Sequence, residues 1–275
     1  MDSHIGKLIR LGRIVRPETG RTIVTATSHG VLTGPPGGQR TREEIAQTFA
    51  KLRKSDGIMV APGMLRFVQD SFIGRDRPGL VVELDWKSWN RPLYSNLRDG
   101  RGEGVTASLA SIEDLAQAGV DAVMTYLYVG HLDSRLEREE IERNARIARE
   151  CARWGIGVII EPRSAREDED DDARSTRVAA FYARVSAEIG ADVVKVIWPT
   201  EGQDGYAEVV ETCFVPVVLA GGPGDETPEG AVALARKAMD AGGAGVMFGR
   251  KIYRSPDPAE TLDRLIEVVH DPVVQ

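Results

Sequence analysis

Short apolar runs alternate with amphipathic runs along the whole chain. The apolar runs are rich in Val, Ile and Ala and are bounded by Gly or Pro, a pattern typical of strands buried on both faces of a parallel sheet. We therefore predict a parallel sheet. The predicted strands are 21–28, 57–63, 79–85, 121–130, 157–162, the run around Lys195 within 190–199, 215–224 and 244–250.

The amphipathic runs repeat their apolar residues with the period of an α-helix that covers such a sheet. Four of them are followed by a glycine (Gly119, Gly155, Gly190 or Gly242), which is typical of left-handed helix C-caps. The predicted helices are 41–54, a short stretch at 64–72, 111–119, 134–154, 176–190, 229–242 and 258–270.

Eight strand–helix repeats in 275 residues predict an α/β fold, a closed (β/α)8 TIM barrel in a single domain. A doubly wound open sheet is the alternative, because the number of strands does not prove closure. The barrel domain is predicted to occupy 21–275, after a short N-terminal helical extension at 1–20.

Basic and apolar residues interleave in the extension. Lys7, Arg10, Arg13 and Arg16 are separated by Ile and Leu residues. We interpret the segment as a short helix that caps one end of the fold. A helix lying on a membrane surface is the alternative.

Composition limits the range of partners. The net charge of −7 gives no basic footprint for nucleic acid. No apolar run approaches the ~20 residues that span a bilayer, so we expect no membrane partner and a cytoplasmic location. The cysteines (Cys151 and Cys213) lie far apart, and the four histidines form no His-x-x-x-His pair. Neither a metal nor another cofactor is therefore expected.

Lys195 is the strongest candidate for chemistry. It lies inside the apolar run Val193–Ile197, and burial disfavours a lysine ammonium. A neutral amine is what imine formation with a carbonyl requires. The alternative is a strand-end lysine whose head reaches solvent.

In a (β/α)8 barrel the functional side chains stand at the carboxyl ends of the strands. Glu161 ends the strand that precedes the Lys195 strand, so its carboxylate is predicted to move protons. The alternative is an ion pair with Arg163 or Lys195 that only holds the mouth of the barrel.

Other strand ends also carry polar residues. The first strand ends in Ser28 and His29, and the fourth carries Tyr126. The third ends in Glu83, Asp85 and Lys87. Of two interpretations of Lys87, a loop lysine or an electrostatic neighbour of Lys195, we favour the loop lysine.

Glycine clusters end the last two strands. Gly221 and Gly222 follow one, and Gly249 and Arg250 follow the other. Glycine lets backbone N–H groups approach an anion, and this end of the barrel is its usual phosphate site. The loop at 30–38 is a candidate substrate cover or a plain connector, and the acidic run at 167–172 is interpreted as a solvated loop.

Five stretches of the chain resemble the class I (Schiff-base) aldolases of bacterial and archaeal type. They are IGKLIRLGRIVRPETGRTIV, SHGVLTGPPGG, VVKVIWP, AGGP and FGRKIY. The family includes archaeal-type fructose-bisphosphate aldolases, aminodideoxyheptulosonate synthases, autoinducer-2 phosphate processing enzymes and, more distantly, tagatose-bisphosphate aldolases. The similarity runs over roughly residues 5–268.

The resemblance implies a (β/α)8 barrel in which Lys195 forms the Schiff base. Glu161, Ser28 and His29 complete the predicted catalytic set. The resemblance further implies that phosphate binds at Gly221, Gly222, Gly249 and Arg250. Arg163 and Tyr126 are the other predicted substrate contacts. The resemblance also implies a homo-oligomer, a decamer being one assembly consistent with it.

Two positions differ from the pattern of the family. The family usually has Asp-His-Gly after the first strand, with the Asp assisting proton transfer, whereas this chain has Ser28. Many members have Tyr before the Pro-Arg pair of the fifth strand, whereas this chain has Glu161, and the tagatose-bisphosphate aldolases are similar to it there. Ser28 leaves open the proton handling, the substrate and the direction of the reaction.

The leading hypothesis is therefore a metal-independent class I aldolase acting on a phosphorylated ketone, such as dihydroxyacetone phosphate, and an aldehyde. One alternative keeps the imine but condenses the ketone with an amino-acid semialdehyde or transfers an acyl group. The other is a non-catalytic barrel that binds a phosphorylated metabolite.

Overall fold

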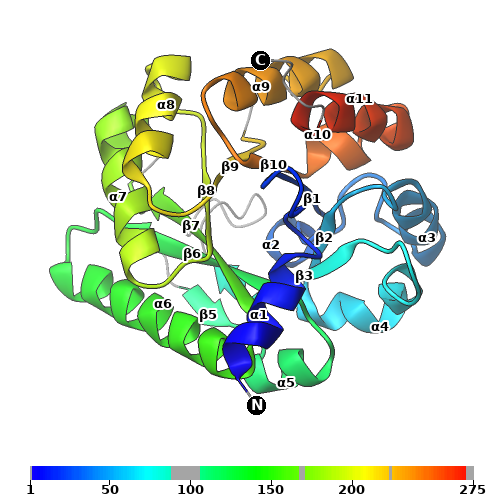
Figure 1. Cartoon of the computed structure of the whole chain (residues 1–275), viewed down its shortest axis with the longest axis horizontal. Helices are drawn as coiled ribbons and strands as arrows, with labels where there is room; N and C mark the ends of the chain where they lie inside the picture. The colour runs from blue at the N-terminus through cyan, green and yellow to red at the C-terminus, as the bar shows by residue number, and fades with distance from the viewer. Residues whose placement is uncertain (1, 88–105, 167–170, 223–224, 271–275) are drawn as a thin grey trace.

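The structure is a computed structural model and describes residues 2–87, 106–166, 171–222 and 225–270. Eight parallel strands close a barrel in the order β1-β10-β9-β8-β7-β6-β3-β2, with helices around it (Figure 1). The predicted (β/α)8 barrel is confirmed, and the open sheet is excluded because β1 pairs with both β2 and β10. The strands are β1 (Thr22–Ala26), β2 (Gly57–Val60), β3 (Gly79–Glu83), β6 (Ala122–Val129), β7 (Gly157–Ser164), β8 (Val193–Val196), β9 (Val217–Ala220) and β10 (Gly245–Phe248).

The helices lie outside the barrel, and the sequence pattern predicted neither the single turn at Gly30–Thr33 nor the longer helix after β8. That helix, α8, follows β8 in a segment with two glycines, which lower helix propensity. Among the described helices, none is both long and apolar enough to cross a membrane. The helices are α1 (Ser3–Leu11), α2 (Gly30–Thr33), α3 (Arg42–Lys51), α4 (Leu65–Val68), α5 (Ile112–Gln117), α6 (Ser134–Trp154), α7 (Thr176–Glu188), α8 (Gly202–Thr212), α9 (Pro228–Asp240), α10 (Arg250–Tyr253) and α11 (Pro258–His270), with 3-10 turns at Pro62–Met64, Gln69–Ser71 and Asp171–Arg174.

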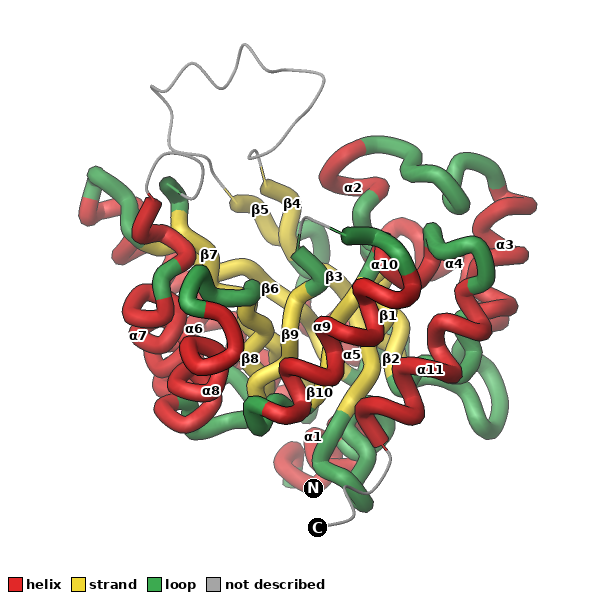
Figure 2. The backbone as a smooth tube through the Cα atoms, turned by 90° about the horizontal axis from the view of Figure 1, so that it is seen from above, coloured by secondary structure: helices red, strands yellow, loops and turns green. Residues whose placement is uncertain are grey.

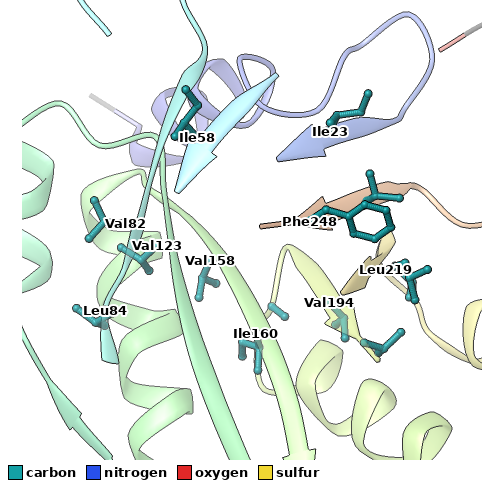
Figure 3. Close-up of a cluster of buried hydrophobic side chains, with 14 of the residues drawn as sticks. Ile23, Ile58, Val82, Leu84, Val123, Val158, Ile160, Val194, Leu219 and Phe248 are labelled. Carbon is teal, nitrogen blue, oxygen red and sulfur yellow. The ribbon is translucent and has the colours of Figure 1, made fainter. Parts of the chain in front are cut away.

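Alternate residues of each strand face opposite sides of the barrel wall. One set points outward and packs under the helices, as Ile23, Val82 and Phe248 do in Figure 3. The other set fills the interior of the barrel with a separate apolar cluster. Its strand residues are Val24, Ala26, Met59, Val81, Ala122, Met124, Tyr126, Tyr128, Ile159, Val193, Val218 and Met247. The residue two positions beyond the last inward apolar residue of a strand therefore also faces inward. At the carboxyl ends of the strands, such residues line the opening of the barrel, called the mouth below.

Aspartates just before the strands fasten the opposite end of the barrel. Asp121 Oδ2 accepts the backbone N–H of Leu80 at 2.8 Å, and Asp121 Oδ1 accepts Arg13 Nη1 at 3.0 Å. Asp56 binds the N–H of Ile23 and the side chain of Arg16 in the same way. The basic residues around α1 thus pair with the strand starts.

A two-stranded antiparallel hairpin, β4 (Asp85–Lys87) with β5 (Thr106–Ser108), stands on the barrel. Figure 2 shows it at the end of the barrel opposite α1. The sequence pattern had included Asp85 in the third barrel strand. That boundary was wrong, because β3 ends at Glu83 and the chain then leaves the barrel wall.

Candidate active site

Lys195 and Glu161 meet at the mouth of the barrel on adjacent strands. Each lies two residues beyond an inward-facing apolar residue, Val193 on β8 and Ile159 on β7. The two strands pair in register at these positions, Ile159 opposite Val193. Lys195 Nζ lies 2.7 Å from Glu161 Oε2, and both residues are buried. The lysine head therefore faces the interior and does not reach solvent.

Glu161 lies between two cations. Its Oε1 atom accepts Arg163 Nη1 at 3.1 Å, while Oε2 faces Lys195. Burial alone would raise the pKa of Glu161, but the charges of Lys195, Arg163 and Lys87 outweigh it and lower that pKa to about 2. The carboxylate is therefore ionised at neutral pH and forms an ion pair with Lys195.

Lys87 also belongs to the mouth, and its interpretation as a loop lysine was wrong. Its side chain is buried, and Nζ lies 3.9 Å from the ring centroid of Tyr126 and 5.6 Å from that of Tyr128. Burial and the charge of Arg163 lower the pKa of Lys87 to about 8. The mouth thus holds, besides Lys195, a lysine whose pKa is lowered and whose amine lies over aromatic rings.

A buried network explains why the chain after β3 turns inward. Asp85 Oδ2 accepts Tyr126 N and Thr125 Oγ1, each at 2.7 Å. Arg143 of α6 donates to Asp85 Oδ1 at 2.8 Å and to the carbonyl of Tyr126 at 2.6 Å. The Asp85 side chain thereby accepts a hydrogen bond from the β6 backbone at Tyr126, beyond the end of β3. This contact holds the chain after β3 over the mouth, together with Lys87.

Glu83 is the inward-facing residue at the end of β3, two positions beyond Val81. It accepts a hydrogen bond from Ser28 Oγ through Oε2. Burial raises the pKa of Glu83 to about 7, although the Ser28 hydrogen bond and the charges of Lys87 and Lys195 oppose that rise. The sequence analysis named Glu83 as a strand-end residue and gave it no role. The same reasoning that selected Lys195, a charge inside an apolar strand, would have selected it.

His29 packs against the start of α10. A Cβ at Gly249 would lie 2.4 Å from His29 Cε1 and 2.7 Å from the carbonyl oxygen of Ala26, so only glycine fits there. His29 also meets the ring of Tyr253 edge-on. Burial, assisted by the charges of Lys195 and Arg250, lowers the pKa of His29 to about 4. The imidazole is therefore neutral at pH 7.

Tyr126 presents a phenol to the site. Burial, together with the negative charges of Glu83 and Glu161, raises the pKa of Tyr126 well above its usual value. The hydroxyl therefore keeps its proton at neutral pH. Its role as a substrate contact stays a prediction.

The predicted phosphate site holds a carboxylate beside its arginine. Glu226 lies between two guanidinium groups, with Arg250 Nε at 3.4 Å from Oε1 and Arg254 Nη1 at 3.4 Å from Oε2. Arg250 is partly exposed, and Gly222 has the left-handed backbone φ of 59°. A phosphate at this site would compete with Glu226 for both arginines.

The structure brings the predicted catalytic residues to one end of the barrel, and their individual roles stay predictions. Sequence reasoning missed two contributions, the Ser28–Glu83 contact and the inward position of Lys87. Two predicted segments fall partly outside the described residues. They are the glycine cluster at 220–224, at positions 223–224, and the acidic run at 167–172, at positions 167–170.

Comparison with known sequences places these residues in a family context. The family model described as DeoC/LacD family aldolase matches residues 22–255. An uncharacterized aldolase of Saccharolobus solfataricus is 30% identical over 267 residues, which cover 97% of this chain and 95% of the relative. The 2-amino-4,5-dihydroxy-6-oxo-7-(phosphonooxy)heptanoate synthase of Streptomyces griseus is 27% identical over 272 residues, covering 98% of this chain and 92% of the synthase.

Solved structures show the same fold. An archaeal fructose 1,6-bisphosphate aldolase superposes with a TM-score of 0.79 at 23% identity, covering 97% of this chain and 100% of that one. A second archaeal fructose-1,6-bisphosphate aldolase, with its catalytic lysine covalently bound to the carbinolamine intermediate, gives 0.77 at 23% identity, with 96% and 99% covered. At these identities the likeness concerns the fold of the barrel.

Proposed function

Because the chain belongs to the DeoC/LacD family of aldolases, we propose that it is a class I aldolase that uses Lys195 to form an imine with a ketone. The ketone is phosphorylated, dihydroxyacetone phosphate being the model donor. The observation that carries the proposal is the 2.7 Å contact between Lys195 Nζ and Glu161 Oε2 inside the barrel. The proposed imine chemistry requires neither a metal ion nor another cofactor.

The first step is attack of the Lys195 amine on the ketone carbonyl. Glu161 accepts the ammonium proton across the contact, and the free amine pair forms the C–N bond. The adduct nitrogen passes a second proton to the alkoxide, which gives the neutral carbinolamine. Protonated Glu161 then gives its proton to the carbinolamine hydroxyl, which leaves as water. The resulting iminium draws electrons from the neighbouring carbon, so that loss of a proton there gives a nucleophilic enamine.

Arg163 and Lys87 keep this site cationic. Both lower the pKa of Glu161 and so favour its ionised form. Arg163 also fixes the carboxylate orientation through its 3.1 Å bond. Phosphate binding is proposed at Gly221, Gly222, Gly249 and Arg250, where the ligand would displace Glu226 from the arginines.

Trapping the imine tests this function. The protein is incubated with dihydroxyacetone phosphate and sodium borohydride, and the modified peptide is identified by mass spectrometry. We expect the adduct on Lys195 in the wild type and none in Lys195→Arg, which keeps a cation beside Glu161. A protein that stays unmodified across a panel of ketone phosphates would contradict the proposal.

A second candidate function is condensation of the ketone phosphate with an amino-acid semialdehyde. It is favoured by the relative from Streptomyces griseus, whose similarity covers 98% of this chain, and by Ser28 in place of the Asp of the family pattern. Assays with dihydroxyacetone phosphate and either aspartate semialdehyde or glyceraldehyde 3-phosphate separate the two functions by which aldehyde is consumed.

A further inference from the structure

We propose that Ser28 and Glu83 form a second acid–base pair of this site, in which the Ser28 hydroxyl serves the oxygen of the aldehyde substrate and Glu83 exchanges the proton through it. The inference rests on the proposed imine chemistry of Lys195. In these terms Ser28 is a catalytic residue and Glu83 a positioning residue that acts through it.

The contact itself is the first observation. Ser28 follows β1 and Glu83 ends β3, so the two come from different strands and are 55 residues apart in sequence. Both are almost fully buried, at 2% and 1% exposure. The Ser28 hydroxyl donates to Glu83 Oε2 when the carboxyl is ionised, and the bond reverses when Glu83 is protonated, because a hydroxyl both donates and accepts.

The other carboxyl oxygen is the second observation. Glu83 Oε1 is buried and has no hydrogen-bond partner among the described residues. Leaving a buried acceptor unpaired is unfavourable, so its presence in a folded protein calls for an explanation, and a catalytic role is one. No partner in the described part of the chain therefore holds this oxygen, whereas the carboxyl bonds Ser28 through Oε2.

The position around the barrel separates this pair from the imine lysine. In the strand order, β3 is three steps from β8 on one side, whereas Glu161 on β7 is next to β8 (Figure 1). A ketone bound to Lys195 therefore has Glu161 beside its nitrogen. In the proposed geometry its reacting carbon faces β1 and β3 across the mouth, where the aldehyde lies against Ser28.

The protonation states of the site favour the same assignment. The alkoxide that forms on the aldehyde needs a proton donor at neutral pH, and Glu161, with its pKa near 2, is already ionised. His29 is neutral with a pKa of about 4. The pKa of Glu83 is about 7, which allows it both forms. The groups that face Glu83 are Ser28 after β1, Asp85 and Lys87 on β4, Tyr126 on β6 and Lys195 on β8.

The step balances without a further reactant. The enamine carbon attacks the aldehyde carbon, and the π electrons of the C=O bond move to its oxygen. Ser28 Oγ–H transfers its proton to that oxygen while protonated Glu83 transfers its own to Ser28 Oγ. The products are a hydroxyl, an iminium on Lys195 and a Glu83 carboxylate, which solvent reprotonates. Cleavage is the reverse.

Two half-reactions separate this role from a structural one. The donor half-reaction is exchange of the dihydroxyacetone phosphate hydrogen next to the imine carbon for deuterium, followed by NMR in deuterium oxide. The full reaction adds glyceraldehyde 3-phosphate or aspartate semialdehyde. We expect Glu83→Gln and Ser28→Ala to lower kcat of the full reaction about 10²-fold and to leave the exchange rate within about twofold of the wild type.

Rescue gives the second readout. Ser28→Asp places a carboxylate directly at the aldehyde, so the double variant Ser28→Asp/Glu83→Gln should recover at least about tenfold of the lost rate. The pH profile of kcat/KM should show a limb near 7 in the wild type that is absent in Glu83→Gln. Ser55→Ala is the control, because it removes a buried hydroxyl that bonds Thr25 Oγ1 and should change neither half-reaction.

The outcomes are distinct. Equal loss of exchange and condensation in both variants, without rescue, would give the pair a structural role and overturn the inference, as would wild-type rates in both. If Glu83→Gln does not fold, as judged by its melting temperature, Ser28→Ala and Ser28→Asp are compared in the same way, by a loss of the full reaction without a loss of deuterium exchange. A wild type that shows neither exchange nor borohydride trapping would overturn the proposed function and this inference with it. Trapping on Lys195, with condensation and exchange lost equally in the variants, would overturn the inference alone.

Discussion

Lys195 Nζ and Glu161 Oε2 lie 2.7 Å apart across two adjacent strands, and Arg163 binds the other oxygen of the same carboxylate. The pair is buried at the mouth of the barrel, where water competes little with the contact. The amine and the carboxylate proposed to accept its proton are therefore held together in the protein without substrate.

Replacing Glu161 by Gln tests this contact. The amide keeps nearly the same shape but cannot accept the lysine proton, so we expect kcat to fall about 10²- to 10⁴-fold. Steady-state kinetics and the rate of borohydride trapping on Lys195 measure the effect. Glu161→Asp, which keeps the carboxylate, should retain more activity than the Gln variant, and equal activities of the two would contradict a proton-transfer role.

Replacing Lys87 by Met should raise the pKa of Glu83. Burial raises the pKa of Glu83, and the charge of Lys87 is one of the factors that oppose this rise, so that the pKa is about 7. Titration of ¹³C-labelled glutamate carboxyls by NMR measures the change without a substrate. Lys87→Arg keeps the charge and should leave the titration near that of the wild type. An unchanged titration in the Met variant would place Lys87 too far from Glu83 to act.

His29 makes stability depend on pH between about 6.5 and 4. Its folded-state pKa is lowered to about 4, so the unfolded chain takes up a proton first as the pH falls. The free energy of unfolding therefore decreases through that window, by at most about 3.5 kcal/mol at about 1.4 kcal/mol per pKa unit. Urea unfolding at pH 7 and pH 4.5 should show a smaller decrease in His29→Asn. The exposed His4 is the control, and His4→Asn should follow the wild-type curve.

Replacing Gly249 by Ala should displace His29. The new Cβ would lie 2.4 Å from His29 Cε1, too close for any real contact, and the backbone there belongs to the proposed phosphate site. We expect the KM for dihydroxyacetone phosphate to rise about tenfold and the protein to lose about 1–3 kcal/mol of stability. Gly63→Ala places its Cβ in open space and is the matched control. Identical kinetics for the two variants would show that the site tolerates the displacement.

Asp121 stabilises the end of the barrel opposite the site. Removing its side chain leaves the Leu80 N–H and the Arg13 guanidinium without their bonds. We expect Asp121→Ala to cost about 1–3 kcal/mol of unfolding free energy and to leave kcat unchanged. Asp263→Ala removes an exposed pair with Lys54 and should cost about 0.5 kcal/mol or less. A variant of Asp121 that loses activity while keeping its stability would contradict this assignment.

Most of the barrel was predictable because its signals are local. Val193, Val194 and Val196 around Lys195 mark a buried strand, and the glycines that follow helices mark their ends. The structure differs from the prediction where the local pattern is weak, as in α8 with its two glycines. It also differs after Glu83, where the Asp85 side chain, instead of a continued barrel strand, bonds the β6 backbone at Tyr126.

The sequence by itself determined the order of the eight barrel strands and of most helices around them, since both follow from periodicity along the chain. The helix α8 and the end of the third strand are exceptions. It also predicted that Lys195 and Glu161 end neighbouring strands at the same end of the barrel, because the carboxyl ends of parallel strands meet there. Only the tertiary structure decided that Ser28 meets Glu83, that Lys87 lies over Tyr126 and that Glu226 sits between Arg250 and Arg254. Those contacts join separate elements, and their distances depend on how β1, β3 and β4 are placed around the closed barrel, which no local pattern encodes.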